Sequence, residues 1–352
     1  MSTRYLLVEP LDTIMVRDGR RFDAGASGRA ASTSPPPSTF GGALHTALGD
    51  PVDEILGAVV QTPHGSLFPV PADIVRHEHA DRRLRVEPRD GSEVWDLDDE
   101  YPLSHLLAGD GEPPPQSWIT ADGLRSWLRA EPPLRPGEKL GRGAGLSAPP
   151  WRPEQRLGLA LRWDGELAGT ASPGLLYAMS HLRPDDGTRF LIPFLHGADV
   201  RVDRDLLRLG GRGRLAMAEL VEPDDDVIPD HPDDFPGGRV AVYLATPALF
   251  GTDSDEPGSG TDLWWAPDGA RLCALASSGP IPVATASDRA GRYAASRQLT
   301  WAAPAGTVFY VDFGDPAAAM SWARRHHGRR LPGVSNSPLR TAGFGMCLTG
   351  SW

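Results

Sequence analysis

Glycine and proline interrupt this chain so often that long helices cannot be its main architecture. The 352 residues include 40 glycines and 35 prolines, together about a fifth of the sequence. Proline lacks an amide hydrogen and glycine loses much conformational entropy on ordering, so both favour turns and element ends. The chain is also longer than a single hydrophobic core usually supports. We therefore expect two α+β domains, built from short strands and a few short helices.

The charge of the chain argues against a surface that is basic all over. The formal net charge is -11, and Lys139 is the only lysine, so arginine supplies the other basic residues. Arginine forms a planar fork that fits phosphate and stacks on bases. The arginines gather in two places, which are Arg17, Arg20, Arg21 and Arg29 in the first, and Arg324, Arg325, Arg329 and Arg330 in the second.

Cysteine use and hydropathy indicate a soluble protein in a reducing, cytoplasmic compartment. Cys273 and Cys347 are isolated, without the paired spacing of a zinc site. No apolar stretch is long enough to span a bilayer, and the first residues lack the layout of a signal peptide. We expect no metal, no cofactor and no membrane partner.

The stretch PPPSTFGGALHTAL, residues 35–48, predicts the start of a helix. Tandem prolines favour an extended approach, so the helix should begin after Pro37 with Ser38 as its N-cap. Thr39 can cap in the same way. A buried stripe at helical spacing follows at Ala43, Leu44, Ala47 and Leu48.

Two glycines in the first turn of this helix need a separate reason. Gly41 and Gly42 each weaken a helix by about 1 kcal/mol relative to alanine. One explanation is an anion that approaches the free amides and the positive end of the helix dipole. The other is close packing of the helix against a strand. The stretch alone leaves both open.

The remaining chain predicts short strands and hairpins. Residues 5–8 predict a first strand, 13–16 a continuation, 117–130 a short helix and 316–327 another helix. The run LLRLGGRGRLAMAELV predicts a hairpin that turns at Gly210 and Gly211. Residues 17–29 bury almost nothing and predict a loop that a partner orders.

Single motifs for catalysis are weak. The glycine runs at 141–145 and 210–214 lack the strand, helix and Lys-Ser/Thr context of a phosphate loop. His77 and His79 have no third ligand at a suitable spacing. His45 could act as a general acid or base on RNA, yet it has no visible partner group.

Several segments in order resemble one family. They are VEPLDTIMVRDGRRFDAG, PPPSTFGGALHTAL, RLGLAL with GLLYAMSHLR, LGGRGR and AGFGMCLTGSW. Together they resemble the third subunit of the Cmr complex, the type III-B CRISPR RNA-guided effector, from the repeat-associated mysterious protein superfamily. His45 and Thr46 stand where such proteins commonly have an arginine, which removes one expected phosphate contact.

The resemblance implies two ferredoxin-like domains, related to RNA-recognition modules and carrying long loop insertions, which we place at residues 1–155 and 156–352. It also implies a non-catalytic subunit of an antiviral ribonucleoprotein. This subunit would hold the 5′ tag of the guide RNA and bridge the large polymerase-like subunit to the backbone subunits.

The residues that we expect to bind RNA combine the helix start, the arginine-rich loop and a C-terminal glycine-rich loop. Backbone amides and arginines would receive phosphate, and Phe22 or Phe344 would stack on a base. The full set is Arg17, Arg20, Arg21, Phe22, Ser38, Thr39, Gly41, Gly42, His45, Arg340, Gly343, Phe344 and Gly345.

Two other functions stay open from the sequence. The first is a metal-independent RNA-processing endoribonuclease that uses His45. The second is a protein scaffold whose glycine-rich loops face neighbouring subunits. Cleavage products would favour the first, and bound proteins without RNA would favour the second.

Overall fold

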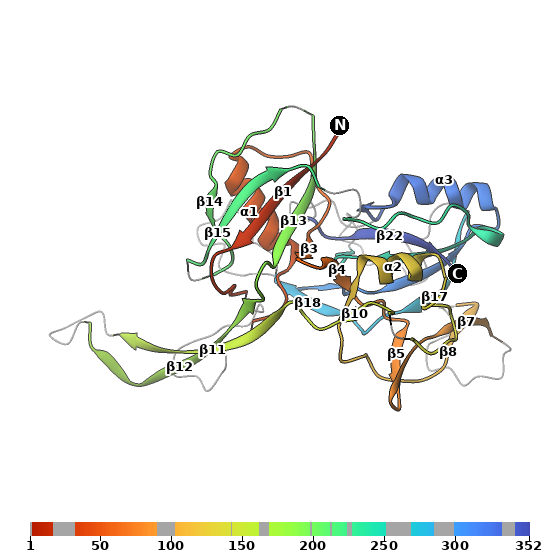
Figure 1. Ribbon diagram of the computed structural model, residues 1–352, viewed down its shortest axis with the longest axis horizontal. Coiled ribbons are helices and arrows are strands. Elements are labelled where there is room, and N and C mark those ends of the chain that lie inside the picture. Colours follow the sequence, from red (N-terminus) through yellow and green to blue (C-terminus); the bar gives the residue numbers. More distant parts are fainter. Residues whose placement is uncertain are drawn as a thin grey trace.

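The fold is a mixed α/β arrangement in which strands dominate (Figure 1). The computed structural model describes residues 2–16, 32–89, 103–141, 143–161, 169–197, 199–211, 213–223, 227–250, 269–284, 299–332 and 342–352. Within these ranges there are three α-helices, namely α1 (Pro37–Leu48), α2 (Ala121–Leu128) and α3 (Pro316–His326). A single 3-10 turn, η1, covers Pro236–Gly238.

The larger sheet contains nine strands of the described chain and is built from both early and late sequence. Its order is β10-β9-β4-β3-β13-β1-β15-β14, and β2 also pairs with β13. The bounds are β10 (Leu146–Ser147), β9 (Trp118–Thr120), β4 (Gly65–Pro69), β3 (Val59–Thr62), β13 (Arg189–His196), β1 (Ser2–Pro10), β15 (Leu215–Val221), β14 (Leu206–Arg208) and β2 (Glu54–Ile55).

The second sheet is formed by the C-terminal part of the chain. Its described strands have the order β17-β20-β16-β22-β21. The bounds are β17 (Arg271–Ala276), β20 (Val308–Asp312), β16 (Arg239–Leu244), β22 (Met346–Ser351) and β21 (Arg329–Arg330).

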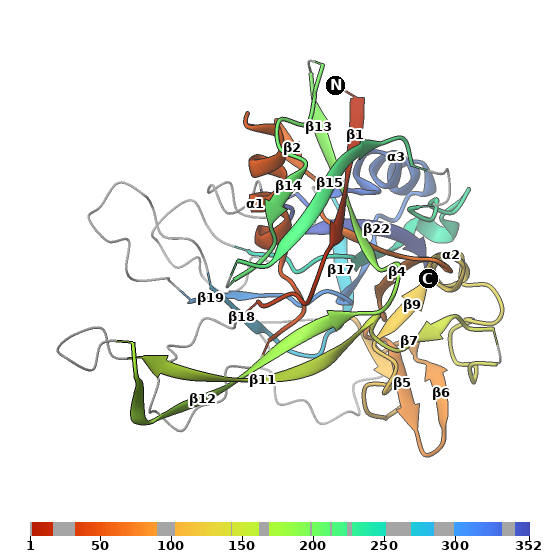
Figure 2. The same ribbon diagram turned by 60° about the vertical axis from the view of Figure 1, so that its left-hand side comes forward.

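Four two-stranded ribbons complete the described strands. They are β11 (Trp151–Leu161) with β12 (Ala171–Pro184), β18 (Ile281–Ala284) with β19 (Leu299–Ala302), β5 (Ile74–His77) with β6 (Ala80–Arg83), and β7 (Arg85–Pro88) with β8 (His105–Ala108). The β11–β12 ribbon projects away from both sheets (Figure 2).

Four neighbouring strands in each sheet follow one connection rule. In the first sheet the spatial order is β3-β13-β1-β15, and in the second it is β17-β20-β16-β22. If the four strands of each group are numbered along the chain, both spatial orders are 2-3-1-4. All the pairs are antiparallel. The two sheets are therefore two copies of one topology, although their sequences show no repeat.

Strand pairing also bears on the expected domain boundary at residue 155. Strand β1 pairs with β13 along Ser2 to Val8 and with β15 along Tyr5 to Pro10. Both partners lie after residue 155, so a boundary there would cut the first sheet in two. The boundary drawn from sequence texture needs correction, because a long insertion separates β3 from its neighbour β13.

Helix α1 covers one face of the first sheet. Its buried stripe includes Ala43, Leu44, Ala47 and Leu48, as the sequence predicts. The stripe packs on strand residues such as Leu6 and on Phe190, whose ring centroid lies 4.6 Å from that of Phe40. Helix α3 covers one face of the second sheet in the same way.

The other faces of the two sheets meet in a shared core. Leu7 and Leu191 of the first sheet belong to the same cluster as Ala241 and Tyr243 of the second. Helix α2 adds Trp127, which is fully buried. The two halves of the chain therefore pack through apolar sheet faces.

A buried carboxylate ties this junction together. Asp73 is fully buried and accepts hydrogen bonds from Arg83 Nε at 2.8 Å, Trp127 Nε1 at 2.9 Å and Tyr310 Oη at 2.8 Å. Arg83 Nη1 also donates to the carbonyl oxygens of Trp127 at 2.8 Å and Leu134 at 3.0 Å. Burial, followed by the Asp73 charge, raises the pKa of Tyr310 well above its usual value.

Several expected elements are confirmed. The hairpin around Gly210 is observed as β14 paired with β15, and the helix predicted over 316–327 is α3. The first strand is longer than expected and spans Ser2–Pro10. Residues 13–16 form only isolated bridges at Ile14 and Met15, and the helix predicted over 117–130 is a short strand followed by α2.

Candidate nucleic-acid interface

The helix that carries the first predicted contacts begins two residues earlier than expected, with Pro36 rather than Ser38 at the N-cap position. Pro37 is its first residue, and Pro36 has an extended backbone with φ -70° and ψ 158°. No side chain caps this helix, so the expectation that Ser38 is the N-cap is wrong. Proline fits the first helical position because its φ is already helical and it has no amide hydrogen to leave unpaired.

The earlier start changes the roles of the two glycines. In a helix that begins at Pro37, the amides of Gly41 and Gly42 have carbonyl partners four residues earlier. They are therefore not free to receive an anion, which corrects that part of the expectation. At this start Thr39 N also donates to Pro36 O at 2.9 Å.

Gly41 and Gly42 differ in their surroundings. A Cβ at Gly41 would lie 3.2 Å from Ala342 Cα and 3.3 Å from Ala342 Cβ, so close packing explains this glycine. A Cβ at Gly42 would meet no atom within 4 Å, and Gly42 is exposed. Packing thus accounts for Gly41 and leaves Gly42 open to a partner.

The described part of the C-terminal glycine-rich loop is buried. Gly343, Phe344 and Gly345 are all buried, and Phe344 is only 1% exposed in a cluster with Leu249 and Val283. Phe344 is therefore unavailable for stacking on a base, which corrects that expectation. Gly343 has φ +89°, and a Cβ there would lie 3.0 Å from Gly57 Cα.

The loop and the helix start nevertheless lie together, as the predicted site requires. Ala342 forms a bridge with Ile55 and contacts Gly41. Val16 lines the same cavity as Ser38 and Thr39. The described residues Val16 and Ala342 therefore both lie beside α1.

Five predicted residues lie outside the described residues, namely Arg17, Arg20, Arg21, Phe22 and Arg340.

A cavity of about 1210 Å³ opens at the start of α1. The prolines before the helix, Ser38 and Thr39 form one wall. Trp118 and Trp151 form another, with ring centroids 5.2 Å apart and planes at 84°. The second half of the chain contributes Thr246 and Pro282. No charged side chain lines it among the described residues.

The sequence did not predict the tryptophans that line this cavity, nor the lining residues that come from the C-terminal sheet region. Trp118, Trp151 and Thr246 come from three distant segments, and only the folded chain brings them to α1. No local spacing signals such a meeting.

His45 lies on the exposed side of α1. Its carbonyl oxygen accepts from Gly49 N at 3.0 Å, where Gly49 ends the helix with φ +76°. A search of the described residues finds no group of three His, Cys, Asp or Glu side chains that could hold a metal ion. Among those residues, too, no helix is both long and apolar enough to cross a membrane.

Comparison with known proteins identifies the class as CRISPR-associated. Residues 6–352 match the family described as CRISPR-associated protein (Cas_Cmr3). This chain belongs to that family, which confirms the resemblance seen in the sequence motifs. No curated protein matches the chain.

Solved structures that resemble the chain include two of the type III-B Cmr-beta complex. One is the cryo-EM structure of the type III-B Cmr-beta bound to cognate target RNA and AMPPnP, state 1, with 14% identity over 91% of this chain and 88% of that chain and a TM-score of 0.48. The other is the type III-B Cmr-beta bound to cognate target RNA, with 14% identity, coverage of 91% and 89%, and the same TM-score of 0.48.

Proposed function

We propose that this chain is a non-catalytic subunit of a type III-B CRISPR RNA-guided effector complex, where it binds the 5′ tag of the guide RNA. Its neighbours would be the large polymerase-like subunit and the backbone subunits. Family membership supports the complex. The observation that carries the RNA site is that Val16 lines the cavity at the start of α1 and that Ala342 packs against the same helix at Gly41.

We further propose that each half of the chain is a ferredoxin-like domain. The shared strand order and antiparallel pairing support this assignment. In the first half α1 connects β1 with β3, and in the second half α3 connects β20 with β22. We place the domains at residues 2–221 and 239–352, with β4 to β12 as an insertion in the first.

The phosphate path that we propose runs over the exposed face of α1. Ser38, Thr39 and Gly42 lie on this face because residues three and four apart are neighbours on a helix. Ser38 and Thr39 are half-buried and supply hydroxyl groups, while Gly42 leaves room for the backbone of RNA. The arginines of residues 17–21 and Arg340 would neutralise the phosphates.

Substitutions of Gly42 test this path. Because its surroundings are open, Gly42→Ala should fold, gain up to about 1 kcal/mol of stability and keep its RNA. Gly42→Asp places a carboxylate on the phosphate path and should weaken RNA binding by about 1 kcal/mol, roughly fivefold. RNA recovered with the assembled complex, purified from its host and sequenced, gives the measurement.

The neutral variant Gly42→Asn is the matched control for size. It should retain more RNA than Gly42→Asp, and the retained RNA should begin with a repeat-derived tag. Equal RNA content in all three well-folded variants would remove the phosphate path. Bound RNA without a common 5′ tag would remove the tag assignment.

The endoribonuclease alternative gives a separate prediction. Purified protein with repeat RNA and a chelator should give no site-specific products, since His45 is exposed on α1 and no described acid or base pairs with its imidazole. Gel analysis of end-labelled RNA is the measurement. Products with a cyclic phosphate end that disappear in His45→Ala would instead establish the enzyme.

A further inference from the structure

The projecting β11–β12 ribbon has a charged root that the proposed RNA site does not use. Its strands are 11 and 14 residues long, so the ribbon reaches roughly 35 Å at about 3.3 Å per residue. Leu157 on β11 is 73% exposed. A two-stranded ribbon has no core of its own and is marginally stable in water, so its direction must be set where it joins the body.

The backbone at the root supplies one attachment. Ile14 N donates to Leu182 O at 2.8 Å, and Leu182 N donates to Ile14 O at 2.8 Å. Thr13 Oγ1 lies 2.9 Å from Nδ1 of the buried His181. Ser32 Oγ also donates to Ser180 O at 2.6 Å. These contacts all involve residues 180–182 of β12, so by themselves they hold the root of the ribbon without setting the angle at which it projects.

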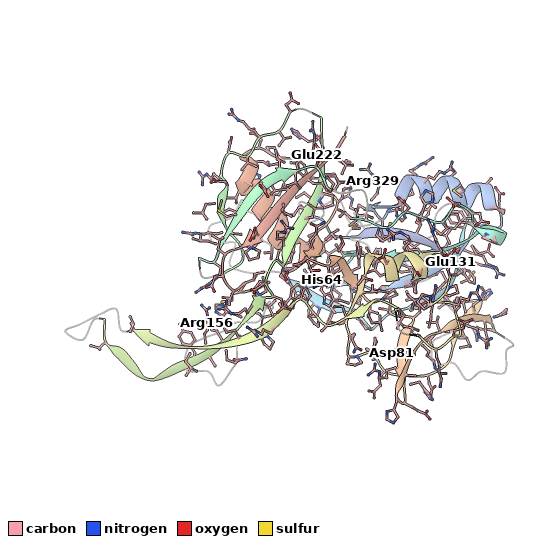
Figure 3. The ribbon with its side chains drawn as sticks, viewed as in Figure 1. His64, Asp81, Glu131, Arg156, Glu222 and Arg329 are labelled. Carbon is pink, nitrogen blue, oxygen red and sulfur yellow. The ribbon has the colours of Figure 1, made fainter. Side chains whose placement is uncertain are left out.

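A carboxylate beside this root gathers three arginines from separate elements. Asp12 pairs with Arg156 of β11 at 3.4 Å, with Arg183 of β12 at 3.3 Å and with Arg214, which precedes β15, at 2.5 Å. Arg156 and Arg183 also share Glu154, with Arg156 Nε 2.7 Å from its carboxylate. Figure 3 shows Arg156 on the ribbon.

The charges in this cluster are fixed at neutral pH. Hydrogen bonds from Arg183 and Arg156 lower the pKa of Glu154 to about 2. Burial raises the pKa of Asp12, but the Thr13 amide and Arg214 outweigh it and lower the pKa overall. Both carboxylates therefore stay ionised, and the paired geometry does not depend on small changes of pH.

We propose that Asp12 is a positioning residue that sets the direction in which the β11–β12 ribbon projects. It joins both strands of the ribbon to Arg214 and so to the sheet that contains β15. The backbone pair at Ile14 fixes where the ribbon is attached, and the Asp12 cluster fixes its angle. Because the ribbon is long and attached at one end, a small angular freedom at the root moves its tip far.

The distance between two spin labels measures this angle directly in the full-length chain. One label is placed at Leu161→Cys, five residues beyond Arg156 on β11, and the other at Glu219→Cys on β15, both at exposed positions. The two natural cysteines, Cys273 and Cys347, are fully buried and should stay unlabelled in the folded protein.

Asp12→Asn removes the charge with almost no change in shape. The distance distribution should widen and its mean should shift, while the melting temperature changes little because the cluster is partly exposed. Glu9→Gln, which removes an exposed carboxylate on β1 three residues before Asp12, should leave the distribution unchanged. About 1 M salt should widen the distribution of the unmutated chain, because it shortens the Debye length to about 3 Å and so weakens the partly exposed pairs of Asp12 with Arg156 and Arg183.

A second variant covers the case in which Asp12→Asn fails to fold. Arg214→Gln cuts the connection to β15 and leaves the pairing of Glu154 with Arg156 and Arg183 intact, so it should also widen the distribution. A distribution that is unchanged in these variants and in high salt would overturn the proposal. So would a widening of equal size in Glu9→Gln.

Discussion

Asp73→Asn should reduce the free energy of unfolding by about 3–5 kcal/mol, because it leaves the buried Arg83 guanidinium without its anion. Both side chains are fully inaccessible, and the Arg83 plane also lies over the Trp127 ring at 4.4 Å. The Asp73 carboxylate lies in the insertion between β3 and β13, and it accepts a hydrogen bond from Tyr310 on β20 of the second sheet. Urea unfolding at pH 7 gives the measurement, and its midpoint should fall sharply.

The exposed pair of Arg85 and Glu87 provides the matched control. Arg85 Nη2 lies 2.7 Å from the Glu87 carboxylate, and the two side chains are 61% and 47% exposed. Glu87→Gln should cost less than about 1 kcal/mol, since exposed ion pairs contribute little. If Asp73→Asn costs no more than this control, the buried network does not join the two halves.

Acid should destabilise the fold through His327. Its Nε2 donates to Pro229 O at 2.7 Å, and its Nδ1 accepts from Thr349 N at 3.0 Å. Burial, helped by the neighbouring His231, lowers the pKa of His327 to about 4 overall, although Pro229 O and Asp230 act to raise it. The native imidazole is therefore neutral and bonded at both nitrogens.

Acid destabilises the fold because the pKa of His327 is lower in the native state than in the unfolded chain. The unfolded chain binds the proton near pH 6.5, so the stability from neutral His327 is complete above that pH. It is lost as the pH falls from about 6.5 to about 4, by roughly 3 kcal/mol in total. Urea unfolding measured in steps between pH 7 and pH 4 should show this loss.

His327→Gln is the informative variant, because its amide can donate to Pro229 O and accept from Thr349 N without titrating. Its stability should depend less on pH in this range than that of the unmutated chain. His64→Gln, at an exposed position in the turn after β3, should keep the original dependence. Parallel slopes for both variants would show that His327 is not the source.

The elements of the fold could be predicted wherever their signal is local. The α1 stripe, the hairpin at Gly210 and α3 all follow from spacing and turn residues. The pairing of β1 with β13 and β15 could not be predicted, because a single sequence gives no sign of which distant strands meet. The domain boundary was misplaced for the same reason.

The candidate site, too, could be predicted only where its signal is local in the sequence. The motif at residues 35–48 correctly marks a helix start, and the C-terminal glycine-rich loop does lie beside it. The sequence could not distinguish Gly41, which packs against Ala342, from Gly42, which is open. It also could not show that Phe344 faces inward, since an aromatic residue between glycines fits a core as well as a stacking surface.

The interleaved first sheet has a consequence for synthesis of the chain on the ribosome. Strand β1 is made first, but its partners β13 and β15 are completed only at His196 and Val221. Until then the apolar residues of β1, such as Leu6 and Val8, have no sheet to join. Strand β1 must therefore wait without its sheet partners, or be sheltered by a chaperone, until the chain has been translated to residue 196 and beyond.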